Sequence, residues 1–264
     1  MDLLPGQSLR FPFFLLGLLT LLSWELARPH HSPAPRRLGR WLENLGLAAI
    51  NGGALTLVCW ACFVIAAREW PPWRFGPFQA IPMPGWIRLA GEVLVLDFLV
   101  YWLHRAYHAA PVLWRFHSVH HSDTELDVST ASRFHLGEVA VSGAAKLGAF
   151  ALLGISPLGL VVFEILLLLA AQFQHANVPL SPGLERALWW ALVPPAMHRI
   201  HHYPERHSTD SNYGTILTLW DRLFRSLRRV DRPSRFGIEG TSGPAPSGIH
   251  RLLGYPFRSS ARTR

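Results

Sequence analysis

The stretch HRAYHAAPVLWRFHSVHH, residues 104–121, places five histidines directly after an apolar run. Nearly eighty residues later, HRIHHYPERH (residues 198–207) repeats the pattern. His104 and His108 are four residues apart, and both HxxHH boxes space their histidines by three and four, so on a helix each set shares one face. The other six of the 14 histidines are scattered, so the three phased clusters indicate a common role.

Metal binding is the role that best fits these clusters. Neutral imidazole is the commonest side-chain metal ligand near neutral pH, and a zinc site takes three or four protein ligands. Eight phased histidines exceed one such site, and ligation by nitrogen alone suits two redox-active irons. The alternatives are a solvated histidine-rich helix or hydrogen-bonded core histidines. The candidate ligands are His104, His108, His117, His120, His121, His198, His201 and His202, with His175 as a ninth at the end of the last apolar segment.

Asp97 is the candidate catalytic residue, because it lies within an apolar run where a carboxylate is costly and usually functional. It shares a helical stripe with Tyr101, His104 and His108, so we expect it to accept the outer N–H of a ligating imidazole. The alternative is a buried carboxylate that is bonded to a neighbouring hydroxyl.

The remaining histidines have less specific settings. His135 and His207 either support a ligand or lie in a loop. His30, His31 and His250 lie in linkers rich in proline or glycine, where we expect them to be solvated.

The apolar residues, half of the 264, are concentrated in blocks, and only 16% of the residues are charged. Runs at residues 11–22 (extending to about 27), 45–67 and 86–103 predict three membrane spans. Residues 138–174 predict a helical hairpin that turns at 154–157 and either spans the bilayer or re-enters it. The sequence therefore predicts an all-α integral membrane protein.

The net charge of +8 is carried almost entirely by arginine. The arginines flank apolar segments, which favours the positive-inside bias of membrane proteins and argues against a nucleic-acid partner. This bias and the number of spans put the histidine boxes on the cytoplasmic side. Cys59 and Cys62, spaced CxxC, lie in an apolar run and indicate two small hydrophobic residues more than a redox pair.

Lys146 and Glu164 are the ionisable residues well inside the two hairpin arms. Counted back from the turn they lie at similar depth, so we expect an ion pair. A lone Lys146 that extends to the interface is the alternative.

Four segments carry a resemblance to a known family: DFLVYWLHRAYH (97–108), HSVHH (117–121), STASRFHLGE (129–138) and HRIHH…DSNYG…WDRLF (198–224). In them the chain resembles the fatty acid hydroxylase/sterol desaturase superfamily of membrane di-iron enzymes, over about residues 90–228. The C-terminal pattern is similar to the alkylglycerol monooxygenase branch. One departure is Ala171, which stands where the fatty acid hydroxylase branch has the first histidine of an HxxxH pair that would end at His175.

The resemblance implies a transmembrane helical bundle with a cytosolic histidine-rich di-iron cap. It divides the chain into anchor helices (1–85), a catalytic domain (86–228) and a basic tail (229–264). The implied activity is hydroxylation or desaturation of a lipid C–H bond with dioxygen, two iron ions and electrons from a separate donor. A membrane zinc hydrolase and a non-enzymatic metal-binding protein are the rival interpretations, although no HExxH motif is present.

Overall fold

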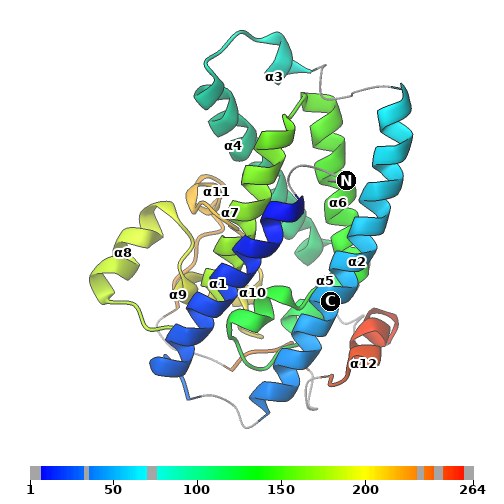
Figure 1. Ribbon diagram of the computed structural model, residues 1–264. Coiled ribbons are helices and arrows are strands. Elements are labelled where there is room, and N and C mark those ends of the chain that lie inside the picture. The colour runs from blue at the N-terminus through cyan, green and yellow to red at the C-terminus, as the bar shows by residue number, and fades with distance from the viewer. Residues whose placement is uncertain (1–6, 33–35, 70–75, 231–234, 241–245, 259–264) are drawn as a thin grey trace.

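The computed structural model describes residues 7–32, 36–69, 76–230, 235–240 and 246–258. Long helices form most of this part of the chain, and short helices connect or cap them (Figure 1). Over the described residues, no β-structure is present beyond one isolated bridge between Leu192 and Leu217, which confirms the all-α prediction. The elements are α1 Gln7–Ala27, α2 Arg37–Glu69, α3 Pro77–Ala80, α4 Gly85–Ala109, α5 Pro111–His121, η2 Val128–Ser132, α6 Leu136–Leu153, α7 Pro157–His175, α8 Pro182–Ala191, α9 Pro195–His201, α10 Arg206–Thr209, α11 Leu219–Leu223, α12 Ile249–Gly254 and η3 Tyr255–Phe257.

The hairpin of α6 and α7 turns where the sequence predicts. Helix α6 ends at Gly154, whose φ of 70° is a left-handed conformation that glycine adopts without a steric penalty. Helix α7 begins with Pro157, and the Ser156 side chain caps it by accepting a hydrogen bond from the Gly159 amide. The predicted turn at residues 154–157 is thus confirmed.

The core of the bundle lies between the hairpin and α4. Leu96 of α4 is buried against Phe150, Ile155 and Phe163 of the hairpin. Helix α1 lies along α7, and a Cβ atom at Gly17 would collide with Gln172, so glycine permits the close approach. At this crossing the Gln172 amide donates to the carbonyl of Phe14 over 3.1 Å.

Within the described residues, three helices have the length and composition to cross a membrane: Leu9–Ala27 in α1, Leu136–Leu153 and Pro157–His175. The first predicted run and both hairpin arms are therefore confirmed as candidate spans. Helix α4 forms where the third span was expected. It carries Arg88, Glu92 and Asp97, and it is not among the candidate spans found in the described residues. The second predicted run lies in α2, but the side chains of residues 55–69, Cys59 and Cys62 among them, lie outside the described part.

The predicted ion pair within the hairpin is present. Lys146 on α6 pairs with Glu164 on α7, at similar depth from the turn. The structure adds a second cation, because Arg10 of α1 lies 2.9 Å from the other carboxylate oxygen of Glu164. One carboxylate thus joins three helices.

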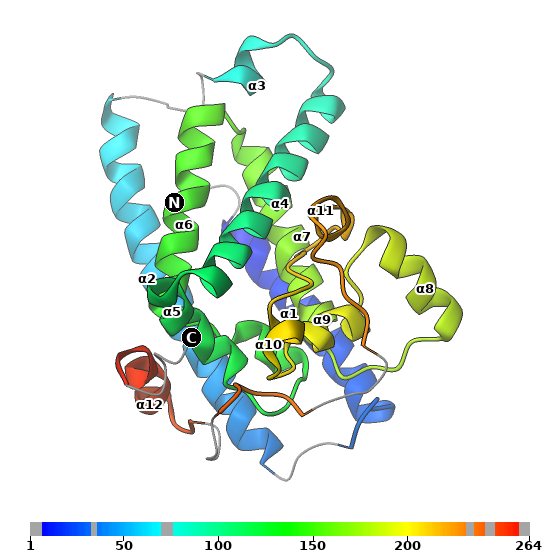
Figure 2. The same ribbon diagram turned by 180° about the vertical axis from the view of Figure 1, so that it is seen from behind.

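The N-terminal and C-terminal segments pack against the histidine-bearing helices. Leu47 of α2, Val119 of α5, Leu252 of α12 and Tyr255 of η3 form one buried cluster. Figure 2 shows α12 beside the lower part of the bundle, near α2 and α5. The division at residues 85 and 228 stays a prediction, but α2 and α12 contribute to the surroundings of α5.

Candidate metal centre

The structure gathers the nine candidate histidines into two buried groups. In each group, one ligand nitrogen from every member lies within 4.8 Å of the others. The first group holds His104, His108, His117, His121 and His201, and the second holds His120, His175, His198 and His202. Every member is at most 8% exposed, so a bound ion would be shielded from bulk water.

Each HxxHH box contributes to both groups. On α5, the i, i+4 pair His117 and His121 joins the first group, and His120 joins the second. On α9 the assignment is reversed: His198 and His202, at the end of the helix, join the second group, and His201 joins the first. Two boxes are therefore needed because each supplies a pair of ligands to one group and a single ligand to the other.

The second group is completed by His175, the last residue of α7. Its Nε2 atom lies 3.0 Å from Nε2 of His198, 3.1 Å from that of His120 and 3.2 Å from that of His202. The Nε2 atoms of His202 and His198 are 3.1 Å apart. In the first group, Nε2 of His121 lies 3.2 Å from Nε2 of His117. The groups adjoin, since the rings of His121 and His202 stack with centroids 4.4 Å apart.

Burial favours the neutral form of four of these imidazoles. Desolvation, with the neighbouring imidazoles, lowers the pKa of His120, His121, His198 and His202 well below its usual value. A neutral imidazole retains a lone pair for a metal. These four imidazoles therefore stay competent to bind a cation at neutral pH.

Hydrogen bonds at the outer Nδ1 atoms orient several rings toward the centre of each group. Nδ1 of His104 lies 2.9 Å from the Tyr213 carbonyl, and Nδ1 of His201 lies 2.7 Å from the Ser211 carbonyl. Nδ1 of His175 lies 2.7 Å from the Ala171 carbonyl. A carbonyl can only accept, so these Nδ1 atoms carry the hydrogen and each Nε2 atom keeps its lone pair.

Glu138 supplies a carboxylate to the set of groups that bond the outer Nδ1 atoms. Its Oε1 atom lies 2.7 Å from Nδ1 of His117, and both side chains are buried. A carboxylate that accepts from the outer nitrogen fixes the orientation of a ligating histidine and raises its basicity. From the sequence, Glu138 was identified only as the start of the hairpin. Two features could have identified it as a site residue: it is a carboxylate in the first turn of an apolar helix, and it lies in a segment that carries the family resemblance.

The hydrogen bonds of Asp97 go to partners other than the imidazole that was predicted. Its carboxylate accepts hydrogen bonds from the Thr215 hydroxyl at 3.1 Å, the Leu217 amide at 3.3 Å and the Trp220 indole at 2.8 Å. None of these donors is an imidazole, and one is a hydroxyl, which matches the alternative given above. The reason lies in tertiary structure: residues 215–220 fold back onto α4, and their donors bond both oxygens of the Asp97 carboxylate. Asp97 thus anchors the segment that begins near Tyr213, whose carbonyl bonds His104.

The other histidines lie outside both groups. His135 caps α6 by accepting from the Gly137 amide, and its Nε2 atom lies 3.1 Å from the Leu253 carbonyl. His207 on α10 and His250 on α12 are exposed, although both lie in short helices and not in loops. His30 and His31 are also exposed, but their backbones are tied to Asn177.

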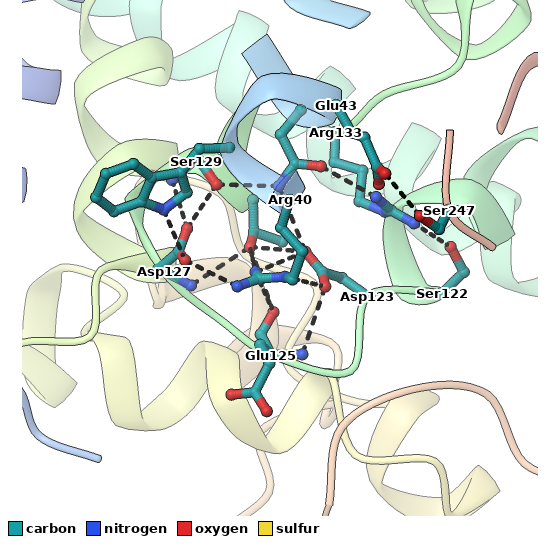
Figure 3. Close-up of polar contacts among 12 residues, drawn as sticks. Arg40, Glu43, Ser122, Asp123, Glu125, Asp127, Ser129, Arg133 and Ser247 are labelled. Atoms are coloured by element: carbon teal, nitrogen blue, oxygen red, sulfur yellow. Dashed lines mark hydrogen bonds and ion pairs between the residues drawn. The ribbon is translucent and has the colours of Figure 1, made fainter. Parts of the chain in front are cut away.

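A cluster of buried charges supports the C-terminal end of α5 (Figure 3). The Arg133 guanidinium, almost fully buried, donates to the Val119 carbonyl, the Ser122 hydroxyl and the Asn44 side chain, each at 3.0 Å. It therefore caps the helix that ends in His120 and His121. Arg40 of α2 joins this cluster, since its guanidinium lies 2.8 Å from Asp123 and 2.9 Å from Asp127.

The ion pairs of this cluster could not be predicted from the sequence, because their partners are distant in the chain. Arg40 is 83 residues from Asp123, and no periodicity links them. Glu25 also has partners that are distant in the chain: its buried carboxylate accepts hydrogen bonds from the amides of Val128 and Asn177, both at 2.7 Å. The segments between the histidine boxes are thus held from α1 and α2.

The donor set fits a metal in each group. In the second group, the lone pair of His175 faces three other imidazole nitrogens, an arrangement that a shared cation would satisfy. With metal–nitrogen bonds of about 2.1 Å, ligand nitrogens at right angles lie about 3.0 Å apart and tetrahedral ones about 3.4 Å. The observed separations of 3.0–3.2 Å are close to those of nitrogens that bind one ion.

In a comparison with known protein families, residues 89–226 match the fatty acid hydroxylase model. The ornithine lipid hydroxylase OlsE of Rhizobium tropici is 30% identical over 171 residues, which cover 64% of this chain and 50% of that protein. Human alkylglycerol monooxygenase is 28% identical over 170 residues, covering 61% of this chain and 36% of that protein. A cholesterol 25-hydroxylase-like protein of Danio rerio is 33% identical over 179 residues, with 62% and 66% covered.

The chain thus spans half or less of the length of OlsE and of human alkylglycerol monooxygenase. No solved structure matches the chain. All nine histidines of the two groups, together with Glu138 and Asp97, lie within the matched residues. Arg40 and Asn44, which support α5, lie before them.

Proposed function

Because the chain belongs to the fatty acid hydroxylase family, we propose that it is a membrane-bound di-iron oxygenase that uses dioxygen to hydroxylate or desaturate a lipid C–H bond. The substrate class is a fatty acyl, sterol-like or ether lipid, in line with the names of the relatives. The observation that carries the proposal is the pair of adjoining all-histidine groups within the matched segment.

The proposed ligands are the nine histidines, five for one iron and four for the other. Iron held by imidazole supplies the redox chemistry that dioxygen activation requires, and the electrons come from a separate donor protein. The side chains of this protein set ligation and orientation. Glu138 and the carbonyls of Tyr213, Ser211 and Ala171 hold imidazole rings in place, and the buried site keeps bulk water away from the reaction.

The lipid reaches the site from the bilayer. The candidate spans α1, α6 and α7 expose apolar side chains, among them Leu16, Leu147 and Leu166, as expected of helices in contact with lipid tails. His175 ends one of these spans, so the second group lies where α7 leaves the apolar layer. We place this end of the bundle, with its histidine boxes, on the cytoplasmic side.

The rival functions fit the site less well. A catalytic zinc site has three protein ligands and one open position. In this protein, nine histidines form two adjoining groups. A non-enzymatic metal-binding protein needs no enclosed pair of adjoining groups.

Lipid analysis under isotopically labelled dioxygen tests the proposal. Membranes from cells that express the wild-type chain should contain a lipid class that carries labelled oxygen or has lost two hydrogens. The same class should be unmodified with the His120→Ala variant. If the two lipid profiles agree although the wild-type chain is folded and carries its metal, the oxygenase assignment is wrong.

A further inference from the structure

Helix α8 has two opposite faces. Its inner face carries Trp189, which is buried with Val193, Met197 and Ile200. The next residue, Trp190, is 75% exposed, and Leu184 and Leu192 are also exposed. With ten residues, α8 is too short to cross a bilayer, and such a helix commonly lies in the interface plane.

The exposed apolar side chains continue from α8 onto two other helices. Leu192 forms a bridge with Leu217, just before α11, where Leu219 and Leu223 are exposed. Trp220 and Phe224 of this segment contact Phe98 and Trp102 of α4, which are themselves partly exposed. We call the set Phe98, Trp102, Trp190, Leu192, Leu219 and Leu223 the α8–α11 surface.

Arginines accompany the aromatic residues of this region. The Arg222 guanidinium lies 4.6 Å from the Trp190 ring, and that of Arg105 lies 5.2 Å from the Trp102 ring. Arg186, Arg225, Arg228 and Arg229 lie on or after the same helices and are exposed. Of the carboxylates on α8 and α11, Asp221 is buried and Glu185 is half-buried. Tryptophan and arginine side by side, with a basic surplus, are typical of a surface that meets anionic lipid headgroups.

The position of α8 also agrees with contact to a bilayer. Its N-cap Ser181 follows the end of the candidate span α7 by six residues. In Figure 1, α8 lies on the outside of the bundle, at heights between the two ends of α1, another candidate span. A water-facing surface at this height would expose large apolar side chains next to the membrane.

We propose that the α8–α11 surface is embedded in the interface of the bilayer and binds anionic lipid. Since Trp189 packs against Met197, the neighbour of His198, the surface also ties the second histidine group to the membrane boundary. The proposal concerns membrane contact alone and holds whether or not the chain is an oxygenase.

Site-directed spin labels test this placement. Single cysteines replace Trp190 or Leu223 in a chain in which Cys59 and Cys62 are serine, and the protein is reconstituted in phosphatidylcholine vesicles. Leu147→Cys on a candidate span and Arg206→Cys on α10 are the lipid-facing and water-facing controls. The measured quantity is the accessibility of each label to dioxygen, which concentrates in lipid, relative to a neutral water-soluble nickel chelate.

The labels at residues 190 and 223 should favour dioxygen, as the Leu147→Cys control does. A preference for the nickel chelate, like that of the Arg206→Cys control, would overturn the proposal. So would protection from both agents together with dipolar broadening between labels, because that result means a second copy of the chain covers the surface.

A lipid-charge arm tests the anionic preference. Adding phosphatidylglycerol should lower the nickel accessibility of the label at residue 223 further. The combined change Arg222→Gln and Arg229→Gln should remove this dependence and leave the Leu147→Cys control unaffected. Equal accessibility in both lipids for the unmodified surface would contradict recognition of anionic lipid.

Discussion

The Oε1 atom of Glu138 lies 2.7 Å from Nδ1 of His117, across 21 residues of chain. This contact joins the first turn of the candidate span α6 to the helix that carries three of the nine histidines. The carboxylate thus couples the packing of the hairpin to the orientation of a proposed ligand.

Replacing Glu138 should therefore weaken metal binding more than folding. We expect Glu138→Ala to lower the affinity of the first group by about 10–100-fold, the usual range for a lost partner of a ligating histidine. Glu138→Gln, which keeps an acceptor oxygen, should lose less. Competition with a chelator measures the affinity, and Glu185→Ala on α8 is the control. Unchanged affinity in Glu138→Ala would remove Glu138 from the metal centre.

Arg133 should be a main support of α5. Replacing it with methionine removes the charged donor from the Val119 carbonyl, the Asn44 side chain and the Ser122 hydroxyl, although the Val119 carbonyl still accepts from the Ser122 hydroxyl. Because hydrogen bonds to a charged group contribute about 1.5–3 kcal/mol each, we expect a clear loss of thermal stability in detergent, also without metal. The exposed Arg251 provides the control substitution, Arg251→Met, which should leave the melting temperature nearly unchanged. Equal melting temperatures for both variants would contradict this role.

For Asp97 the structure predicts a change in stability. Asp97→Ala removes the acceptor of the Leu217 amide and of the Trp220 indole, both of which are donors. Each buried donor that is left without an acceptor costs about 1–3 kcal/mol. Trp220→Phe removes one of these contacts and should cost less, and the two effects should not add, because both break the hydrogen bond between Asp97 and Trp220. Strictly additive losses in thermal unfolding would show that Asp97 acts elsewhere.

Glu164 has two cations, so the loss of one should be tolerated. Lys146→Met leaves Arg10 2.9 Å from the carboxylate and should destabilise only mildly. Lys146→Met with Arg10→Met leaves Glu164 unpaired, which we expect to cost about 3–5 kcal/mol. Adding Glu164→Leu to that double variant should recover most of the loss. The measurement is thermal stability in detergent. A triple variant that is no more stable than the double variant would contradict the contact of Glu164 with both cations.

Local patterns made much of this architecture predictable from sequence. Helical phasing of His104, His108 and the two boxes identified the histidines that converge, and hydropathy with Gly154 and Pro157 identified the hairpin. The depth of Lys146 and Glu164 followed from counting residues along two antiparallel helices. Each of these inferences needs only the geometry of one helix or one turn.

Tertiary relationships could not be read in the same way. Whether His120 joins His117 or His175 depends on how α5 faces α7 and α9, which no spacing encodes. The donors to Asp97 lie 118–123 residues away, and Arg40 of α2 meets Asp123 across 83 residues. Arg10 reaches Glu164 because α1 packs on α7, and the sequence of α7 contains no sign of that contact.

The number of irons per chain tests the central claim most directly. Purified protein reconstituted anaerobically with ferrous iron should hold two irons per chain. Each histidine group is expected to bind one iron. His121→Ala with His201→Ala leaves three histidines in the first group, and His120→Ala leaves three in the second, so each variant should lower the count to about one. The exposed His207 gives the control His207→Ala, which should keep both. A wild-type chain that holds one metal, or His120→Ala and His121→Ala/His201→Ala variants that both retain two irons, would contradict the two-group di-iron centre.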